Sequence, residues 1–124
     1  LGDVYKRQTD TEYLKWILDQ GCFLGLDRYP GRLVSPHMRT VTLKKLMDMG
    51  YGERLCPSHD CICLHIHNEQ PDGTIAEQHD FHKSNPDQYL FMHRHVIPEL
   101  QELGATDRDI EMLFVDNPRR MFEA

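Results

Sequence analysis

Charged and polar side chains directly follow two predicted strands, and their types and positions could support chemistry. Residues 22–26 (CFLGL) lead into Asp27 and Arg28, and residues 54–58 (RLCPS) lead into His59 and Asp60. An Asp can ligate a metal and accept a proton, and the planar guanidinium of an Arg suits a carbonyl or phosphoryl oxygen. The structural alternatives are that Asp60 caps the next element or pairs with a nearby cation, and that Asp27 and Arg28 form a surface ion pair.

A second group of residues combines thiols and imidazoles. Cys56 is followed by Cys61, Cys63, His65 and His67, the last four at every second position. An extended segment places alternate residues on one side, and thiolate and imidazole are ligands that zinc prefers. The usual pairs of zinc-knuckle cysteines are absent. This cluster nevertheless defines the alternative to an enzyme, which is a small zinc-binding interaction module without catalysis.

The composition excludes several classes of protein. The 124 residues are 40% hydrophobic and 27% charged, which indicates a single globular domain. The formal net charge of −6 offers no basic surface for phosphates, and no apolar run approaches the roughly 18 residues of a membrane helix. Four Cys are too few and too clustered for a secreted disulfide scaffold. We therefore expect a soluble, cytoplasmic protein with no nucleic-acid or membrane partner.

Helices and strands alternate along the predicted chain. Helices are expected over 11–20, 40–49, 85–103 and 107–115, with Pro98 kinking or dividing the third and Thr106 and Asp109 capping the fourth. Strands are expected over 22–26 and 54–58, a loop over 29–38 and a long irregular segment over 61–84. Leu90, Val96, Ile97 and Leu100 are the core candidates of the third helix. The alternation predicts an α/β fold, in which active sites lie at the carboxyl ends of parallel strands.

The first eight residues differ from the rest. Residues 1–8 (LGDVYKRQ) have no apolar period and match the translation of a familiar sequencing adaptor. We expect them to be a non-native scar, which is excluded from fold reasoning. The natural sequence is then expected to begin near Thr9 and to be cut upstream, so that the chain is a fragment.

Five short blocks resemble the phosphotriesterase family of the amidohydrolase superfamily, in the family's order and at its spacing. They are residues 25–28 (GLDR), 50–52 (GYG), 58–60 (SHD), 96–98 (VIP) and 115–122 (VDNPRRMF). The resemblance implies that residues 9–124 are the C-terminal third of a (β/α)8 TIM barrel, with its last two strands and the helices that follow. It also implies that the parent is a binuclear-metal-dependent hydrolase of phosphotriesterase or lactonase type, with two divalent metal ions, zinc, and a homodimeric assembly.

The resemblance also implies roles for individual residues. Asp60 matches the family's strand-8 Asp, which ligates the more buried metal and accepts the proton of the bridging hydroxide. Asp27 and Arg28 match the top of strand 7, Ile62 is expected to line the leaving-group or acyl pocket, and residues 61–84 are expected to form the substrate lid. Lactonase-like members carry Arg at the position of Arg28, whereas dedicated organophosphate hydrolases carry His. The implied substrate is therefore a lactone or ester in preference to a phosphotriester.

The remaining metal ligands of the family have no counterpart in this chain. They are a His-x-His pair on strand 1, a bridging carboxylated Lys or Glu on strand 4, and the His of strands 5 and 6. A single carboxylate cannot replace the hydration that two metal ions would lose. We therefore expect the parent protein to be the enzyme and this chain alone to be inactive.

Overall fold

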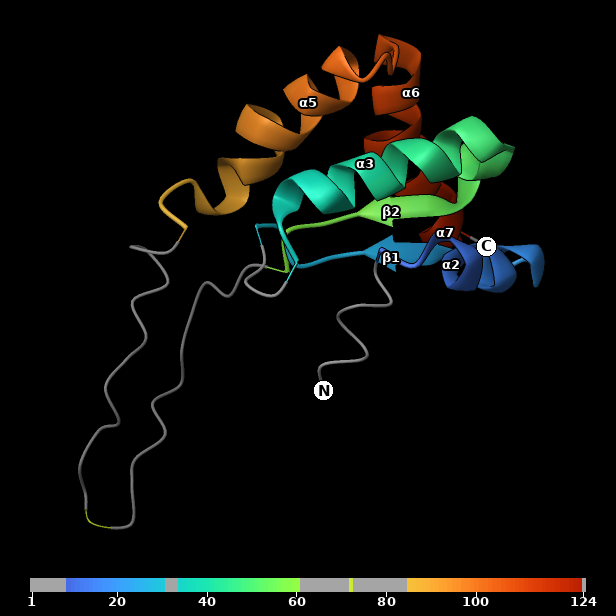
Figure 1. Ribbon diagram of the computed structural model, residues 1–124, viewed down its shortest axis with the longest axis horizontal. Helices are drawn as coiled ribbons and strands as arrows, with labels where there is room; N and C mark the ends of the chain where they lie inside the picture. The colour runs from blue at the N-terminus through green and yellow to red at the C-terminus, as the bar shows by residue number, and fades with distance from the viewer. Residues whose placement is uncertain (1–8, 31–33, 61–71, 73–84, 124) are drawn as a thin grey trace.

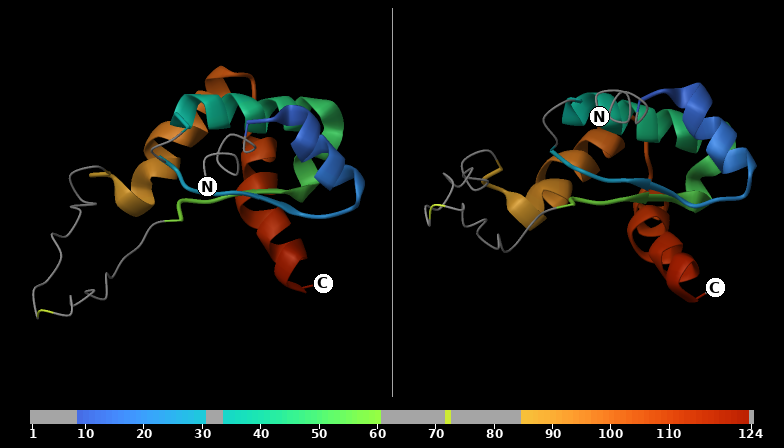
Figure 2. Two further views of the ribbon diagram at one scale, coloured as in Figure 1. Left: turned by 60° about the horizontal axis from the view of Figure 1, so that its bottom comes forward. Right: turned by 90° about the horizontal axis from the view of Figure 1, so that it is seen from below.

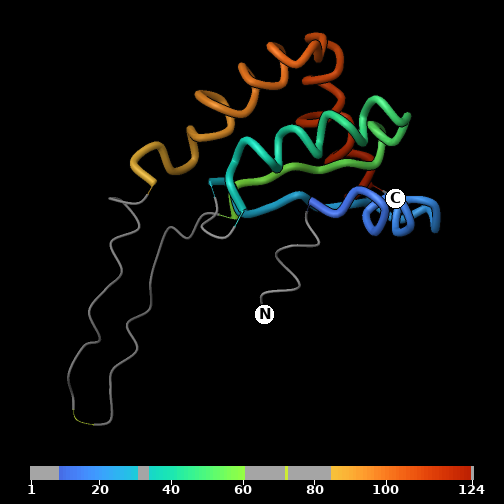
Figure 3. The backbone as a smooth tube through the Cα atoms, viewed as in Figure 1, coloured from blue at the N-terminus to red at the C-terminus, as the bar shows by residue number. Residues whose placement is uncertain are grey.

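Two parallel strands lie at the centre of the computed structural model, which describes residues 9–30, 34–60, 72 and 85–123. Strand β1 (Leu24–Leu26) pairs with β2 (Leu55–Pro57), with Leu24 opposite Leu55 and Leu26 opposite Pro57. Figures 1 and 3 show the two strands running side by side in the same direction. Both strands lie inside the predicted segments, and the prediction of an α/β fold with parallel strands is confirmed.

Helices precede, connect and follow the strands. The first is α2 (Thr11–Asp19), capped by the Asp10 side chain, which accepts a hydrogen bond from the Tyr13 backbone N–H. Between the strands lie α3 (Pro36–Leu46), a π-helical turn (Met47–Tyr51) and a 3-10 turn (Gly52–Arg54). After β2 come a 3-10 turn (Gln88–Leu90), a π-helical turn (Met92–Val96), α5 (Ile97–Glu102), α6 (Asp107–Glu111), a π-helical turn (Met112–Asp116) and α7 (Asn117–Glu123).

Helix α3 begins four residues before the predicted helix. The Ser35 side chain accepts a hydrogen bond from the Met38 backbone N–H, and Pro36 occupies the first turn. A proline is favourable there because its missing N–H would have no partner inside the helix. The prediction of a loop over 29–38 is therefore wrong at residues 36–38, because Pro36 begins the helix and does not break it.

The third predicted helix widens just before Pro98 and continues past it, so it is not divided there. The π-helical turn Met92–Val96 ends two residues before Pro98, and the π-helical turn Met112–Asp116 ends two residues before Pro118. A proline cannot donate to the preceding turn and its ring clashes with the carbonyl four residues back, so the helix widens to accommodate it. The capping box of Thr106 and Asp109 is confirmed.

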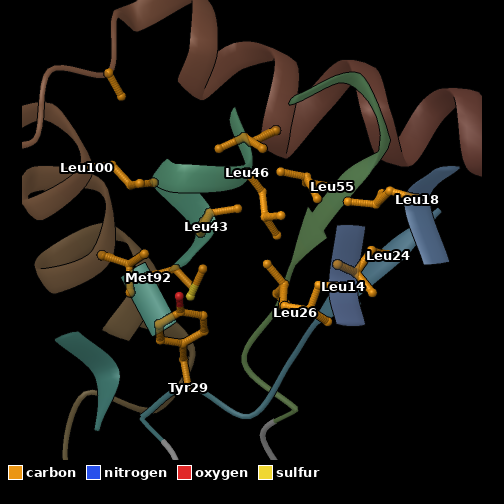
Figure 4. Close-up of a cluster of buried hydrophobic side chains, with 13 residues drawn as sticks. Leu14, Leu18, Leu24, Leu26, Tyr29, Leu43, Leu46, Leu55, Met92 and Leu100 are labelled. Carbon is orange, nitrogen blue, oxygen red and sulfur yellow. The ribbon is translucent and has the colours of Figure 1, made fainter. Parts of the chain in front are cut away.

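The core lies between the strands and α3. Leu43, Leu46, Leu55 and Leu100 are fully buried, and Figure 4 shows Tyr29 reaching from the loop after β1 towards Met92. Helix α3 packs against α5 on one side of the strands, whereas the end of α7 lies on the other side (Figure 2). None of the described helices is both long and apolar enough to cross a membrane.

Two of the four core candidates of the third predicted helix lie outside the buried core. Leu90 is 49% exposed and Ile97 is half-buried, whereas Met92 is buried in the core. A regular α-helix from residue 85 up to Pro98 would place Leu90 on the inner face. Because the chain forms a 3-10 turn at 88–90 and a wider turn after it, the inner face rotates to Met92.

Candidate functional site

The parallel pairing brings Asp27 and Arg28 to the same edge of the sheet as His59 and Asp60. Asp27 and Arg28 follow β1, His59 and Asp60 follow β2, and the Ser58 backbone N–H donates to the Leu26 carbonyl at 3.0 Å. Arg28 Nε lies 3.2 Å from Asp60 Oδ2 and 4.0 Å from Asp27 Oδ2. The structure therefore joins the two motifs, and Asp60 does pair with a nearby cation.

The backbone at this edge is unusual. Arg28 has φ 67° and Asp60 has φ 48°, both in the left-handed region that residues other than glycine rarely occupy. Such conformations persist where the surrounding structure holds them, and they concentrate at functional sites. The Arg28 and Asp60 side chains are 43% and 50% exposed, so water screens their attraction and the pair adds little stability. The backbone of Arg28 and Asp60 is thus held in place, while their ion pair contributes little to stability. Both side chains can therefore contact a ligand.

His59 has a different role from its neighbour Asp60. Its Nε2 accepts a hydrogen bond from the Met92 backbone N–H at 3.3 Å, and its ring lies edge-on to Tyr89 with 6.1 Å between centroids. Burial, followed by the nearby His93, lowers the pKa of His59 against an opposing backbone hydrogen bond to Tyr89. His59 is therefore a neutral anchor that fastens the start of the last helices to the end of β2.

A buried arginine hydrogen-bonds to the backbone of the site. Arg39 on α3 is 3% exposed, and its Nη1 donates to the Asp27 carbonyl at 2.5 Å. Its Nε donates to the Val34 carbonyl at 3.4 Å, and its guanidinium carbon lies 6.0 Å from the centre of the Tyr29 ring. Sequence reasoning missed this residue. The available signal was its spacing from two apolar residues, since Arg39, Leu43 and Leu46 stand at i, i+4 and i+7 and so share one helix face.

Tyr29 directly follows Arg28 in the chain, and its side chain lies in the core. It is 1% exposed, and burial raises the pKa of Tyr29 to about 12, against smaller opposing effects of Thr40 and Arg39. The ring is therefore uncharged at physiological pH. Its burial fixes the chain immediately after Arg28.

The described residues can supply part of a metal site. Among them, no three His, Cys, Asp or Glu side chains converge as a metal site requires. Asp60 fits as one oxygen ligand, because its carboxylate is half exposed at a strand end. Burial raises the pKa of the Cys56 thiol, which disfavours the thiolate that zinc binds. The other candidates, Ile62, Cys61, Cys63, His65 and His67, lie outside the described residues.

Sequence comparisons place the chain among known proteins. A sequence model of the phosphotriesterase family matches residues 2–122. A phosphotriesterase homology protein from Mycobacterium tuberculosis is 32% identical over 117 residues, which are 93% of this chain and 33% of that protein. An aryldialkylphosphatase from Saccharolobus solfataricus is 30% identical over 123 residues, which are 98% of this chain and 36% of that protein.

Solved structures give the same result. The structure of the phosphotriesterase from Mycobacterium tuberculosis matches with a TM-score of 0.77 and 30% identity, covering 93% of this chain and 34% of that one. A mutant of a lactonase from Deinococcus radiodurans, described as phosphotriesterase-like, matches with a TM-score of 0.74 and 28% identity, covering 92% of this chain and 35% of that one. The chain thus spans about a third of the length of the relatives that it matches.

Proposed function

Since the chain belongs to the phosphotriesterase family, we propose that it is the C-terminal third of a metal-dependent hydrolase that opens lactones or esters. Its fold is part of that family's (β/α)8 TIM barrel. One observation carries the proposal: Arg28 and Asp60 meet at 3.2 Å at the carboxyl ends of neighbouring parallel strands. This is the end of a TIM barrel at which catalytic residues lie.

In this proposal Asp60 is the proton acceptor and a metal ligand. Two divalent metal ions, zinc, would polarise the electrophile and lower the pKa of water in the whole protein. Asp60 would supply one ligand, and the others would come from the part of the barrel outside this chain. A carboxylate oxygen of Asp60 would take the proton that the attacking water loses, and the support is its position after the carboxyl end of β2, half exposed beside Arg28.

Arg28 acts on the substrate. Its planar fork of N–H donors orients the carbonyl oxygen of a lactone or ester, and Asp27 beside it holds the guanidinium in place. Ile62 lines the acyl pocket in this proposal, and residues 61–84 cover the substrate. The preference for a lactone over a phosphotriester depends on Arg28, which replaces the His of the dedicated triesterases.

The setting of the protein is also proposed. We place it in the cytoplasm, without nucleic-acid or membrane partners, and the support is its net charge of −6 and the free thiols of Cys22 and Cys56. A homodimer follows from the family resemblance alone and stays a prediction.

Parallel assays of the whole protein test the function. We expect lactone opening to be faster than paraoxon-type hydrolysis, and we expect Asp60→Asn to lower kcat for the lactone by about 10²- to 10⁴-fold, as for loss of a general base. Asp48→Asn is the matched control, because Asp48 is 63% exposed and forms an i, i+4 ion pair with Lys44. It should leave kcat unchanged.

Three outcomes would contradict the proposal. Faster triester turnover would overturn the substrate preference, and full activity of Asp60→Asn would remove Asp60 from catalysis. The upstream gene sequence is an independent check. The missing βα units would occupy about 200 residues upstream. If that coding region lacks a His-x-His pair and a strand-6 His, the protein is not a metal-dependent hydrolase of this type.

A further inference from the structure

We infer that Arg39 is a positioning residue, which fixes the backbone from which Arg28 reaches the substrate. This inference rests on the proposed function of Arg28. Arg39 lies on α3, which the loop after β1 separates from Arg28 in the chain. Its side chain is nevertheless buried and donates to the Asp27 carbonyl at 2.5 Å. A hydrogen bond from a charged donor is among the stronger ones in a protein.

Three contacts surround Arg28 along the chain. The Leu26 carbonyl accepts from the Ser58 backbone N–H at 3.0 Å, the Asp27 carbonyl accepts from Arg39, and the Tyr29 side chain is buried in the core. Arg28 stands between these contacts with φ 67°. The left-handed conformation is unfavourable for a residue with a Cβ, so it persists only because its neighbours are held.

The guanidinium makes bonds that a smaller or apolar side chain could not make. Nη1 and Nε of Arg39 donate to the carbonyls of Asp27 and Val34, so one side chain ties two positions of the chain to the start of α3. A buried charge is costly unless it is hydrogen-bonded, and Arg39 shares its helix face with Leu43 and Leu46. An apolar residue would be the simpler solution for packing alone. The bonds that Arg39 makes are directed at the site.

The consequence is specific to the orientation of Arg28. Without the bond from Arg39, the Asp27 carbonyl can rotate and Arg28 can relax from its left-handed conformation. Its guanidinium then leaves the position 3.2 Å from Asp60. The catalytic pair is lost although neither of its members has been changed.

The test uses the whole protein and a matched arginine. Arg54 also donates from Nη1 to a backbone carbonyl, that of Leu18 at 2.8 Å, but it lies before β2 and away from the catalytic edge. Arg39→Met and Arg54→Met should both lower the Tm. We expect only Arg39→Met to lower kcat, by about 10- to 100-fold, as for loss of a group that orients a catalytic residue.

A conservative variant and an exchange measurement separate positioning from folding. Arg39→Lys keeps the charge but offers no fork, so it should recover only part of kcat while restoring the Tm, and it carries the test if Arg39→Met does not fold. Amide hydrogen exchange at residues 27–29 should be about tenfold faster in Arg39→Met, the effect of losing one charged hydrogen bond, and unchanged in Arg54→Met. Equal loss of kcat in the two Met variants, or full kcat in Arg39→Lys, would overturn the inference.

The failure of the proposed function would look different. If the unmodified protein hydrolyses neither a lactone nor a triester, the proposed function fails. Hydrogen exchange then decides alone: faster exchange at residues 27–29 in Arg39→Met supports the positioning role, and unchanged exchange there contradicts it.

Discussion

Arg28 joins the two strand ends through a half-exposed ion pair with Asp60. Such a pair contributes little to stability, because water screens it. A substitution at Arg28 should therefore alter the chemistry of the edge more than the folding of the chain. This makes Arg28 a suitable residue for testing substrate preference.

Arg28→His should move the preference towards phosphotriesters. An imidazole offers fewer donors than a guanidinium and is shorter, so it binds a lactone carbonyl less well and leaves more room at the mouth of the barrel. We expect kcat/KM for the lactone to fall about tenfold, as for the loss of one charged hydrogen bond, while triester hydrolysis is unchanged or rises. Steady-state kinetics on both substrates measure this. An unchanged ratio of the two kcat/KM values would show that Arg28 does not select the substrate.

At the scale of elements, one side chain fixes α7 against the start of β2. Asn117 is fully buried, and its Nδ2 donates to the carbonyls of Gly52 at 2.7 Å and Leu55 at 2.8 Å. Both carbonyls lie at the amino end of β2, opposite the end at which Arg28 and Asp60 meet. In TIM barrels this end serves stability and the other serves chemistry. Asn117 should therefore matter for folding and not for turnover.

Asn117→Leu should lower the free energy of unfolding of the whole protein by about 2 kcal/mol, because it removes both donors from buried carbonyls. Denaturant unfolding measures this. Arg120→Ala is the control on the same helix, since Arg120 contacts Glu53 at the surface with 3.5 Å between the charged atoms, and it should change stability by less than about 0.5 kcal/mol. If Asn117→Leu also lowers the free energy of unfolding by less than about 0.5 kcal/mol, the hydrogen bonds from Asn117 to Gly52 and Leu55 do not stabilise the fold.

At the scale of the whole molecule, the described residues leave apolar surface uncovered. Phe122 is 82% exposed, Trp16 is 60% exposed and Met121 is 48% exposed. The described part of the chain contains a sheet of two strands, which cannot close a barrel. Strand edges and apolar side chains without neighbours favour association with other chains.

We therefore predict that residues 9–124 expressed alone are insoluble or molten and show no hydrolase activity. Size-exclusion chromatography and thermal unfolding measure this. A compact monomer with a sharp, cooperative transition would show that these elements are stable without the rest of a barrel.

Zinc binding by the same chain tests the alternative of an interaction module. We expect weak binding or none, because Asp60 alone cannot hold a metal and burial raises the pKa of the Cys56 thiol. Metal analysis of the purified chain, before and after a chelator, is the measurement. Stoichiometric zinc with unfolding on chelation would favour the module built by Cys56 and the Cys and His residues after it.

Local features of the sequence were sufficient to predict most of the elements. The capping box of Thr106 and Asp109 and both strands depend on residues close together in the chain, and the structure confirms them. The charged residues at both strand ends were also visible in the sequence. Their common edge followed from the prediction of parallel strands, since parallel strands place their carboxyl ends together.

Contacts between distant residues were decided by the tertiary structure alone. The sequence does not show that Arg28 reaches Asp60, that His59 binds the backbone of Met92, or that Arg39 holds the Asp27 carbonyl. Each contact depends on the strand register or on the rotation of a helix about its axis. A shift of a few residues, such as the early start of α3 or the wider turn before Pro98, changes which side chain faces inward. Local propensity does not determine that rotation, because the packing of helices against the strands does.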